Sequence, residues 1–523
     1  MYYPSILNDV IGPVMRGPSS SHCAAALRIG RMARDLMDGE IEEVLVEFDT
    51  NGSLATTHES QGSDMGLLGG LMGWEPTDER LAESPRWIGE AGIRVETRIT
   101  DLRAEHPNTY QLTLNNSTEQ HTMTAISTGG GMIEVVAIDG VPMSLAGDYH
   151  ETLLYLDSSD PELLSYLREH VDADEVAPRR ALCADTQIIE IKAQRMLDPD
   201  VTAVLRSQFG IRHVKHISPV LPVLSRKRLR VPFITCAEML RYNASLNLDL
   251  WELALRYESA RGHLSEAQVF QRMADIVQIM HASILIGIEG TQYADRILGY
   301  QSGGYRARMD EGRLLDGGML NRIILYVTAL MEAKSSMGVI VAAPTAGSCG
   351  GLPGACLGAA TDMGLSLDEM TRAMLAAGMI GVFIAAHATF AAETGGCQAE
   401  CGAGSGMAAA ALVTLAKGTA GQAIAAASMA LQNILGMICD PVANRVEVPC
   451  LGKNVLAASN ALACANMALA DYDAVIPLDE VIETMDRVGK SLPRELRCTA
   501  LGGLSVTKTS RKIEAKLNTQ RVA

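Results

Sequence analysis

The first 150 residues combine one helical pattern with several short strand patterns. Apolar residues recur at helical spacing from about Ala24 to Met37 and predict a helix that follows a serine-rich segment. Before it, Ser5 to Ile11 predicts a lead-in helix or turn that ends at Gly12-Pro13. Strand patterns follow at Val44–Phe48, Arg94–Ile99, Tyr110–Leu114, His121–Ser127 and Ile133–Ile138. Residues 1–150 are therefore predicted to form an N-terminal α/β domain.

The pattern changes between residues 151 and 223. The predicted elements are strand Thr152–Leu156, helix Pro161–His170, strands Ala181–Cys183 and Gln187–Ile191, helix Asp198–Phe209 and strand His213–Ile217. This βαββαβ order resembles that of a small ACT-type regulatory domain. Ser158-Ser159-Asp160 stands where such domains often carry a glycine-containing ligand loop. Ligand sensing and a structural or dimerisation role therefore both remain open for this ACT-like domain.

The second half of the chain is dominated by helical periodicity. Residues 224–232 contain four basic side chains and predict a solvated linker. From Phe233 the helical pattern continues to about Ala470, and a late helix is expected at Leu478–Val488 with Gly489 as its stop. Residues 233–523 are thus predicted to form an all-α domain, and the whole chain an α+β multidomain protein.

One apolar stretch and two glycine-rich runs of this half need separate interpretation. The uncharged stretch from Met374 to Ala392 is close to membrane-spanning length. Glycine and histidine interrupt it, so a buried helix at the centre of an all-α domain is the better prediction. Glycine-rich runs at 347–354 and 402–406 are expected to be loops.

Composition excludes some classes of function. The 523 residues are 48% hydrophobic but only 4% aromatic, which favours close packing of small and aliphatic side chains. The formal net charge of −17 argues against a nucleic-acid surface, which needs a basic stripe. The N-terminus lacks a signal pattern, and an odd number of cysteines, 11, fits a reducing compartment. A cytoplasmic protein with no membrane partner is therefore expected.

Three cysteines in the second half stand beside residues that shape the backbone. Gly395-Gly396 precede Cys397, Asp440-Pro441 follow Cys439, and Pro449 precedes Cys450. Their spacing is not that of a local metal motif, so only tertiary folding could gather them. Free cysteine is also a common buried residue, and spacing alone leaves core packing as an open alternative.

Several longer motifs resemble a known family. They are IGPVMRGPSSSH (11–22), HPNT (106–109), STGGGMIEV (127–135), APTAGSCGG (343–351), GGCQAE (395–400), CDPVANRVEVPC (439–450) and LPRELRCTALGGL (492–504). In this order they are similar to the two halves of the iron–sulfur-dependent L-serine dehydratases, which some members carry as separate chains. The resemblance covers nearly the whole sequence.

The resemblance implies a cofactor and a reaction. It places three ligands of a [4Fe–4S] cluster at Cys397, Cys439 and Cys450. A cluster held by three thiolates leaves one iron free to act as a Lewis acid on the β-hydroxyl of L-serine. Loss of water would leave an enamine, which tautomerises and is hydrolysed to pyruvate and ammonia. A small-molecule amino-acid substrate and a homodimeric assembly are expected.

The candidate substrate-binding and catalytic residues come mainly from the first domain. Serines at a helix start can cap it or present an anion site, and Ser19, Ser20 and Ser21 are expected to hold a substrate carboxylate. The candidate bases are His22, His58 and His106, since a base with a pKa near neutrality suits removal of the α-proton. Asn108, Ser348 and His387 are candidate substrate contacts. The glycines of STGGGMIEV predict either a plain hairpin or a close backbone approach to a ligand or partner domain. The site would form where the first and last domains meet.

Some positions depart from the family pattern. Cys23 stands in place of a threonine, Gln61-Gly62-Ser63-Asp64 in place of HGTD, and His387 in place of an asparagine. Two alternatives follow. The same chemistry could act on threonine, cysteine or another β-substituted amino acid, or the chain could bind an amino acid without turnover.

Overall fold

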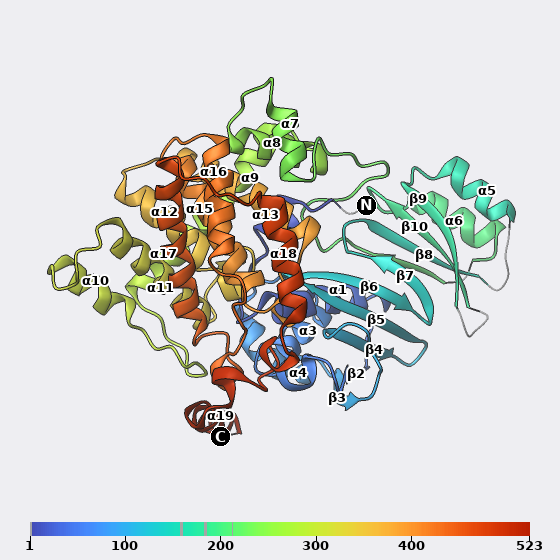
Figure 1. Ribbon diagram of the computed structural model, residues 1–523. Coiled ribbons are helices and arrows are strands. Elements are labelled where there is room, and N and C mark those ends of the chain that lie inside the picture. The colour runs from blue at the N-terminus through green and yellow to red at the C-terminus, as the bar shows by residue number, and fades with distance from the viewer. Residues whose placement is uncertain (1–2, 157–160, 182–185, 212, 523) are drawn as a thin grey trace.

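The computed structural model describes residues 3–156, 161–181, 186–211 and 213–522. Figure 1 shows three units: a sheet with helices at its back from the first part of the chain, a smaller sheet with two helices, and a large helical bundle. A β-rich N-terminal region and a helical C-terminal region confirm the mixed α+β class.

The N-terminal unit is built on a six-stranded sheet with the order β3-β2-β4-β5-β6-β7. Its strands are β2 (Glu43–Asp49), β3 (Arg94–Thr100), β4 (Thr109–Asn115), β5 (Gln120–Gly129), β6 (Met132–Ile138) and β7 (Val141–Leu145). Five of these agree with the predicted strands. The sixth, β7, was not predicted because it is short and contains Pro142, which an edge strand tolerates.

Two helices of this unit carry the functional segments, and glycine brings them into backbone contact. They are α1 (Ala25–Leu36), which follows the π-helical turn η2 (Ser20–Ala24), and α3 (Ser63–Leu71). A Cβ on Gly70 would lie 2.1 Å from the carbonyl oxygen of Leu27, and one on Gly66 would lie 2.0 Å from that of Cys23. Only glycine therefore permits this crossing. The remaining short helices are α2 (Leu54–Thr57), η3 (Glu79–Glu83) and α4 (Ser84–Glu90).

The middle unit has the βαββαβ order that the sequence predicted. Its elements are β8 (His150–Leu156), α5 (Pro161–His170), β9 (Glu175–Arg180), β10 (Gln187–Ala193), α6 (Pro199–Gln208) and β11 (Val214–Ile217). The sheet is antiparallel with the order β11-β8-β10-β9. The predicted strand Ala181–Cys183 lies mostly outside the described residues, as do Ser158-Ser159-Asp160, and the described strand β9 ends just before it at Arg180. Strand β9 lies at the edge of the sheet with no buried residue, so no apolar run marked it. A regulatory role for this unit stays a prediction.

The helical unit surrounds one buried central helix. Its helices are α7 (Cys236–Asn243), α8 (Leu250–Gly262), α9 (Glu266–Glu289), α10 (Ser302–Asp310), α11 (Met319–Ser335), α12 (Gly351–Asp362), α13 (Leu367–His387), α14 (Ala392–Gly395), α15 (Ala403–Leu415), α16 (Ala420–Gln432), α17 (Cys450–Leu469), α18 (Leu478–Ser491) and α19 (Lys508–Val522). Among the described helices, only α13 is long and apolar enough to cross a membrane, and 72% of its most apolar window is buried in the protein. The prediction of a buried central helix is confirmed.

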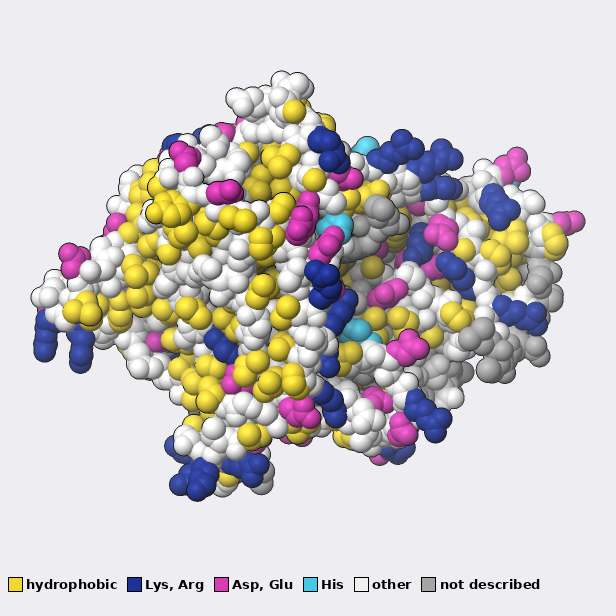
Figure 2. Space-filling view, in the orientation of Figure 1, with side chains coloured by type: hydrophobic (Ala, Val, Ile, Leu, Met, Phe, Trp, Pro, Cys, Tyr) yellow, Lys and Arg dark blue, Asp and Glu magenta, His cyan; other side chains and the backbone are white. Residues whose placement is uncertain are grey.

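The surface of the helical unit is unusually apolar on one side. Figure 2 shows apolar side chains gathered over the bundle, whereas most charged side chains in view lie over the other two units and at the margins. The exposed large side chains include Leu456 and Met467 of α17. The homodimer expected from the sequence stays a prediction.

The first residues of the chain pack into the helical unit and not against the N-terminal sheet. The lead-in turn η1 (Ile6–Val10) is π-helical and buried. A Cβ on Gly378 of α13 would lie 2.5 Å from Ile6 Cγ2, and one on Gly381 would lie 2.0 Å from Val10 Cγ1. These two glycines leave room on α13 for the apolar side chains of η1. The carboxylate of Glu258 in α8 accepts hydrogen bonds from the backbone N–H of Ile6 and from the hydroxyl of Ser5.

Three glycine predictions for this unit were wrong in whole or in part. Gly489 lies within α18 and does not end it. A Cβ there would lie 2.8 Å from the Cα of Gly395, so glycine serves packing at this position. The run 347–354 forms the short turn η4 (Ala346–Ser348) and the start of α12, and the run 402–406 forms the start of α15. Glycine at several of these positions permits close packing, as at Gly354 against Val327 of α11 and at Gly489 against Gly395.

The glycine contact between α1 and α3 yields a test of stability. Gly70→Ala is expected to lower the free energy of unfolding by about 2 kcal/mol or more, because the added methyl group meets backbone that cannot move aside. The control is Gly89→Ala in α4, where no atom lies within 4 Å of an added Cβ, and a gain of about 0.5–1 kcal/mol is expected. Thermal and urea denaturation measure both. Equal stability of the two variants would contradict the proposed contact.

Candidate functional site

Five cysteine thiols lie together between the helical and N-terminal units. We call Cys397, Cys401, Cys439, Cys450 and Cys498 the thiol pocket. All five side chains are buried. Cys397 hydrogen-bonds with Cys401 and Cys439, Cys439 hydrogen-bonds with Cys498, and Cys450 is near enough to Cys397 for their charges to interact.

The three cysteines singled out by sequence thus lie in one pocket, with two that were not singled out. Cys397 stands between α14 and the π-helical turn η5 (Gln398–Gly402), Cys439 precedes η6 (Val442–Asn444), and Cys450 is the first residue of α17. Cys401 lies one turn after Cys397, and Cys498 follows η7 (Arg494–Leu496). Sequence analysis missed the last two because cysteine type alone does not separate a pocket residue from a core residue.

The pocket favours one thiolate. Hydrogen bonds from Cys401 and Cys439, together with the charge of Lys453, outweigh burial and hold the pKa of Cys397 well below its usual range. Burial lowers the pKa of Lys453, but the nearby Cys397 thiolate and Asp440 raise it by more, so this lysine stays charged. In contrast, burial and the Cys397 thiolate raise the pKa of Glu400 to about 8.

The donor set fits an iron–sulfur cluster. Cysteine thiolates are the usual protein ligands of such clusters, and the pocket presents several from well-separated segments of the chain. Lys453 provides a positive charge beside these thiolates. Metal binding would release the protons that the sulfurs now share in hydrogen bonds.

The serine turn faces the helical unit. Ser21 Oγ donates to Glu393 Oε1 at 3.0 Å, and Ser20 Oγ accepts the backbone N–H of Ala346 at 3.1 Å. Ser19 Oγ lies 3.0 Å from His22 Nδ1 and makes no capping hydrogen bond. The hydroxyls of Ser20 and Ser21 therefore join the N-terminal unit to η4 and α14, whereas that of Ser19 stays within its own turn.

The close backbone approach expected for STGGGMIEV is also present. A Cβ on Gly129 would lie 2.8 Å from the backbone nitrogen of Ala391, the residue before α14. Ser127 Oγ at the same end of β5 donates to the carbonyl oxygen of Ser21 at 2.7 Å. The glycine turn therefore meets the helical unit next to Glu393.

Two polar side chains at this junction are buried with atoms that have no hydrogen-bond partner among the described residues. Among the described residues, neither amide atom of Asn108 has a hydrogen-bond partner, although its side chain is fully buried. Glu393 Oε2 is likewise buried and unpartnered in the described structure. Burying a polar atom without a hydrogen-bond partner is costly, so these atoms indicate a ligand that supplies the missing hydrogen bonds. Asn108 was predicted as a substrate contact, whereas Glu393 was missed because a lone glutamate in a helical region carries no sequence signal.

His22 has both ring nitrogens engaged. Thr57 Oγ1 donates to the carbonyl of Ser53, so it accepts a hydrogen bond from His22 Nε2–H at 2.8 Å. His22 Nδ1 then accepts from Ser19, with Glu393 Oε1 at 3.5 Å. Burial lowers the pKa of His22, which agrees with this neutral tautomer.

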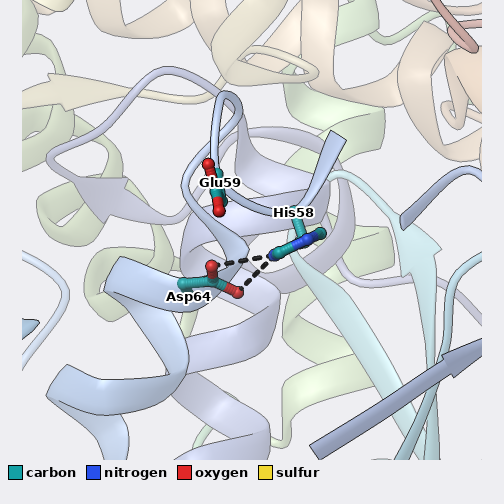
Figure 3. Close-up of side chains that lie close together, drawn as sticks. All are labelled: His58, Glu59 and Asp64. Atoms are coloured by element: carbon teal, nitrogen blue, oxygen red, sulfur yellow. Dashed lines mark hydrogen bonds and ion pairs between the residues drawn. The ribbon is translucent and has the colours of Figure 1, made fainter. Parts of the chain in front are cut away.

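His58 has one free ring nitrogen. Its Nδ1 lies 2.9 and 2.8 Å from the two oxygens of Asp64 (Figure 3). Burial lowers the pKa of His58, but the hydrogen bond and charge of Asp64 outweigh it and leave the pKa raised. Among the described residues, none hydrogen-bonds to Nε2. His58, Glu59 and Asp64 also lie close enough to hold a metal ion, but Nδ1 is already committed to Asp64.

The remaining candidates lie in different places. His106 is partly buried, its Nδ1 accepts the backbone N–H of Asn108 at 3.2 Å, and burial lowers its pKa despite the charge of Glu393. Ser348 is buried in η4, where it hydrogen-bonds with Thr345. His387 is exposed at the end of α13, and its Nε2 lies 3.2 Å from the carbonyl oxygen of Ile234, so the structure does not bring it to the junction.

Gln61, one of the departures from the family pattern, reaches the thiol pocket. Its Nε2 donates to Asn444 Oδ1 at 2.9 Å and lies 3.5 Å from Cys498 Sγ. A cavity of about 500 Å³ lies nearby, lined by Asp64, Lys334, Arg445 and others. Groups of both charges thus border the approach to the junction.

Comparison with known proteins agrees with this two-part site. Residues 11–137 match the family model described as serine dehydratase beta chain, and residues 245–505 match the one described as serine dehydratase alpha chain. These two matches cover the N-terminal unit's sheet through β6 and most of the helical unit, and leave the middle unit outside both.

Individual relatives show the same division. The chain is 35% identical over 285 residues to the probable L-serine dehydratase alpha chain of Bacillus subtilis, covering 54% of this chain and 95% of the relative. It is 40% identical over 154 residues to the probable beta chain from the same organism, covering 29% of this chain and 69% of the relative. L-serine dehydratase 1 of Escherichia coli is 28% identical over 501 residues, 94% of this chain and 96% of the relative. The chain therefore belongs to the L-serine dehydratase family, with alpha-type and beta-type regions joined in one polypeptide.

Proposed function

We propose that this protein is an iron–sulfur-dependent L-serine ammonia-lyase that converts L-serine to pyruvate and ammonia. The observation that carries the proposal is the junction itself. The thiol pocket of the helical unit lies beside unpartnered buried polar atoms from both units, at Asn108 and Glu393. A ligand with both charges and hydrogen-bonding groups suits that arrangement.

Cys397, Cys439 and Cys450 would hold a [4Fe–4S] cluster. When bound, the cluster supplies a Lewis-acidic iron that eases departure of the β-hydroxyl group. The protein supplies the thiolates, and the positive charge of Lys453 balances theirs. Lys453 Nζ is held in place by a hydrogen bond of 2.7 Å to Asp440 Oδ1. Burial of the pocket keeps bulk water from the reactive position.

Glu393 and Asn108 are suited to the two ends of an amino acid. The ammonium group of serine would satisfy Glu393 Oε2, since a buried carboxylate needs a counter-charge or hydrogen bonds. Asn108 Nδ2 would donate to the substrate carboxylate. Ser21 positions Glu393 by donating a hydrogen bond to its other oxygen.

His58 is the best candidate for the base that removes the α-proton. The Asp64 carboxylate fixes the tautomer with the proton on Nδ1 and leaves Nε2 as the acceptor. His22 and His106 both use Nδ1 as an acceptor from protein groups, so their neutral forms carry the proton on Nε2. In this proposal His22 and His106 position the substrate-binding residues.

A substrate panel tests the function directly. Anaerobically reconstituted protein is expected to release pyruvate and ammonia from L-serine faster than it acts on L-threonine or L-cysteine. Faster turnover of another amino acid would change the proposed substrate. Tight binding of L-serine without ammonia release would instead indicate an amino-acid sensor.

The proposed ligands predict a colour change. Cys439→Ser is expected to abolish the brown absorbance of anaerobically purified protein and its activity together, because it removes a thiolate from the set. The matched control is Cys464→Ser, a buried cysteine of α17 whose sulfur contacts Asn433 and Asn460 away from the thiol pocket. It should retain both properties. Loss of colour in the control would contradict the ligand assignment.

The role of Glu393 predicts a change in KM. Glu393→Gln removes the charge that would pair with the substrate ammonium group, and KM for L-serine is expected to rise by about 10- to 100-fold. The exposed Glu495→Gln serves as the control and should leave KM unchanged. Steady-state kinetics on cluster-loaded protein measure both. An unchanged KM in Glu393→Gln would overturn this role.

The His58–Asp64 pair predicts a shift in pH dependence. Asp64 raises the pKa of His58, and a base must be deprotonated to act, so activity should fall as pH drops through that pKa. Asp64→Asn lowers the pKa and should move the acidic limb of kcat/KM to lower pH, with a smaller maximum. Asp101→Asn, an exposed carboxylate of the same unit, should leave the profile in place. An unmoved limb in folded Asp64→Asn would exclude His58 as the base.

A further inference from the structure

The loop that joins two of the proposed cluster ligands carries a side chain that reaches across to the N-terminal unit. This side chain is Asn444 at the end of η6, and the residue is 3% exposed. Its Nδ2 donates to the carbonyl oxygen of Thr56 at 2.6 Å and to Ser60 Oγ at 2.7 Å. Its Oδ1 accepts from Gln61 Nε2 at 2.9 Å. One amide therefore uses both of its N–H groups and its oxygen on a single segment of the other unit.

That segment carries the proposed base. Thr56, Ser60 and Gln61 stand on either side of His58, whose Nε2 is the proposed acceptor of the α-proton. Within the segment, Ser60 Oγ donates to the carbonyl oxygen of Thr57 at 3.4 Å, and the backbone N–H of Gln61 donates to the same oxygen at 2.9 Å. The turn after α2 is thus internally bonded, so a shift at the contacts with Asn444 would also move His58.

The loop around Asn444 is held from its other side by the C-terminal part of the chain. Asn444 and Ala443 have φ values of +56° and +48°, in the left-handed region that non-glycine residues rarely adopt. The N–H of Ala443 donates to Ser510 Oγ of α19 at 2.7 Å, and Ser505 Oγ donates to the carbonyl oxygen of Pro441 at 2.8 Å. Backbone conformations of this kind persist only where neighbouring contacts maintain them, so the amide of Asn444 projects from a well-fixed loop.

Two further hydrogen bonds connect the N-terminal end of this segment to the helical unit. Ser53 Oγ donates to the carbonyl oxygen of Cys498 at 2.9 Å, and Thr56 Oγ1 donates to that of Thr499 at 3.1 Å. Neither bond involves Asn444. Loss of the Asn444 side chain should therefore leave the two units docked and allow the turn at 57–61 to shift.

We propose that Asn444 is a positioning residue that fixes His58 Nε2 relative to the cluster ligands, and so relative to the Cα–H bond of serine. This inference rests on the proposed function. A base must lie within hydrogen-bond reach of the proton that it removes, and a displacement of about 1 Å can slow a reaction roughly 100-fold. Asn108 and Glu393 would hold the substrate from other segments, so the role of Asn444 concerns kcat and not KM.

Asn444→Gly tests this role, because glycine accepts the left-handed backbone and only the side chain is lost. In anaerobically reconstituted protein, kcat for L-serine is expected to fall by about 10- to 100-fold and KM to change by less than about twofold. Iron and sulfide content should match wild type. With serine deuterated at Cα, the primary isotope effect should be at least as large as in wild type, because removal of the α-proton is the step that slows.

The matched control is Asn247→Gly, at an exposed asparagine with φ of +50°. It should leave kcat, KM and the isotope effect unchanged. If Asn444→Gly does not fold, Ser60→Ala replaces it, since this variant removes one of the three partners of the Asn444 amide. A smaller fall in kcat, about 2- to 10-fold, is then expected.

Hydrogen exchange on cluster-free protein gives a readout that does not depend on activity. The amides of residues 57–64 are expected to exchange about tenfold faster in Asn444→Gly than in wild type, because the turn has lost its connection to the loop. The amides of α13 should exchange as in wild type. Unchanged exchange at residues 57–64 would contradict the proposal.

The kinetic outcomes separate this inference from the proposed function. If Asn444→Gly holds its cluster and keeps the wild-type kcat, the inference is overturned although the proposed function stands. A fall in kcat with a smaller isotope effect would also overturn it, because a step other than proton removal would then have slowed. Loss of the cluster from Asn444→Gly would show that Asn444 supports the ligand loop and not the base. If wild-type protein neither holds a cluster nor releases pyruvate, the proposed function itself fails.

Discussion

The hydrogen bond from Ser21 to Glu393 joins the two halves of the site, and the positions of the other groups depend on it. It crosses from the turn before α1 to the short helix α14, which leads directly into Cys397. A hydrogen bond between a hydroxyl and a buried carboxylate contributes roughly 1.5–3 kcal/mol, enough to fix one orientation of the carboxylate. With one oxygen fixed in this way, the other is presented to the junction, next to Asn108 and the thiols.

The same junction explains why glycine is so frequent around it. Gly129 permits the turn between β5 and β6 to touch the backbone before α14, and Gly489 permits α18 to touch Gly395. On the other side, Gly66 and Gly70 bring α3, which follows Gln61 and begins near Asp64, against α1. Backbones in contact leave few ways for the segments to shift, so the polar groups they carry are held in position by main chain and not by flexible side chains.

Much of the architecture could be predicted from the sequence because it depends on local periodicity. The strands at 44–48 and 121–127, the helix at 24–37 and the βαββαβ order all follow from patterns within a few residues of one another. The strand β9 and the continuation of α18 through Gly489 could not, since an exposed edge strand has no apolar run and a glycine's packing partner is distant. Within the site, long motifs marked Cys397, Cys439, Cys450 and Asn108. Glu393 and Cys498 could be assigned to the site only from their tertiary contacts, because a single glutamate or cysteine has the same sequence pattern in a core as in a functional site.

The packing of η1 on α13 has a consequence for how the chain is made. Ile6 and Val10 fill spaces beside Gly378 and Gly381, which the ribosome reaches more than three hundred residues later. At about 5–20 residues per second, that delay is roughly 20 to 70 s. Throughout it the apolar beginning of the polypeptide has no native partner, so a nascent chain of this protein would present a chaperone-binding segment until synthesis of the central helix is complete.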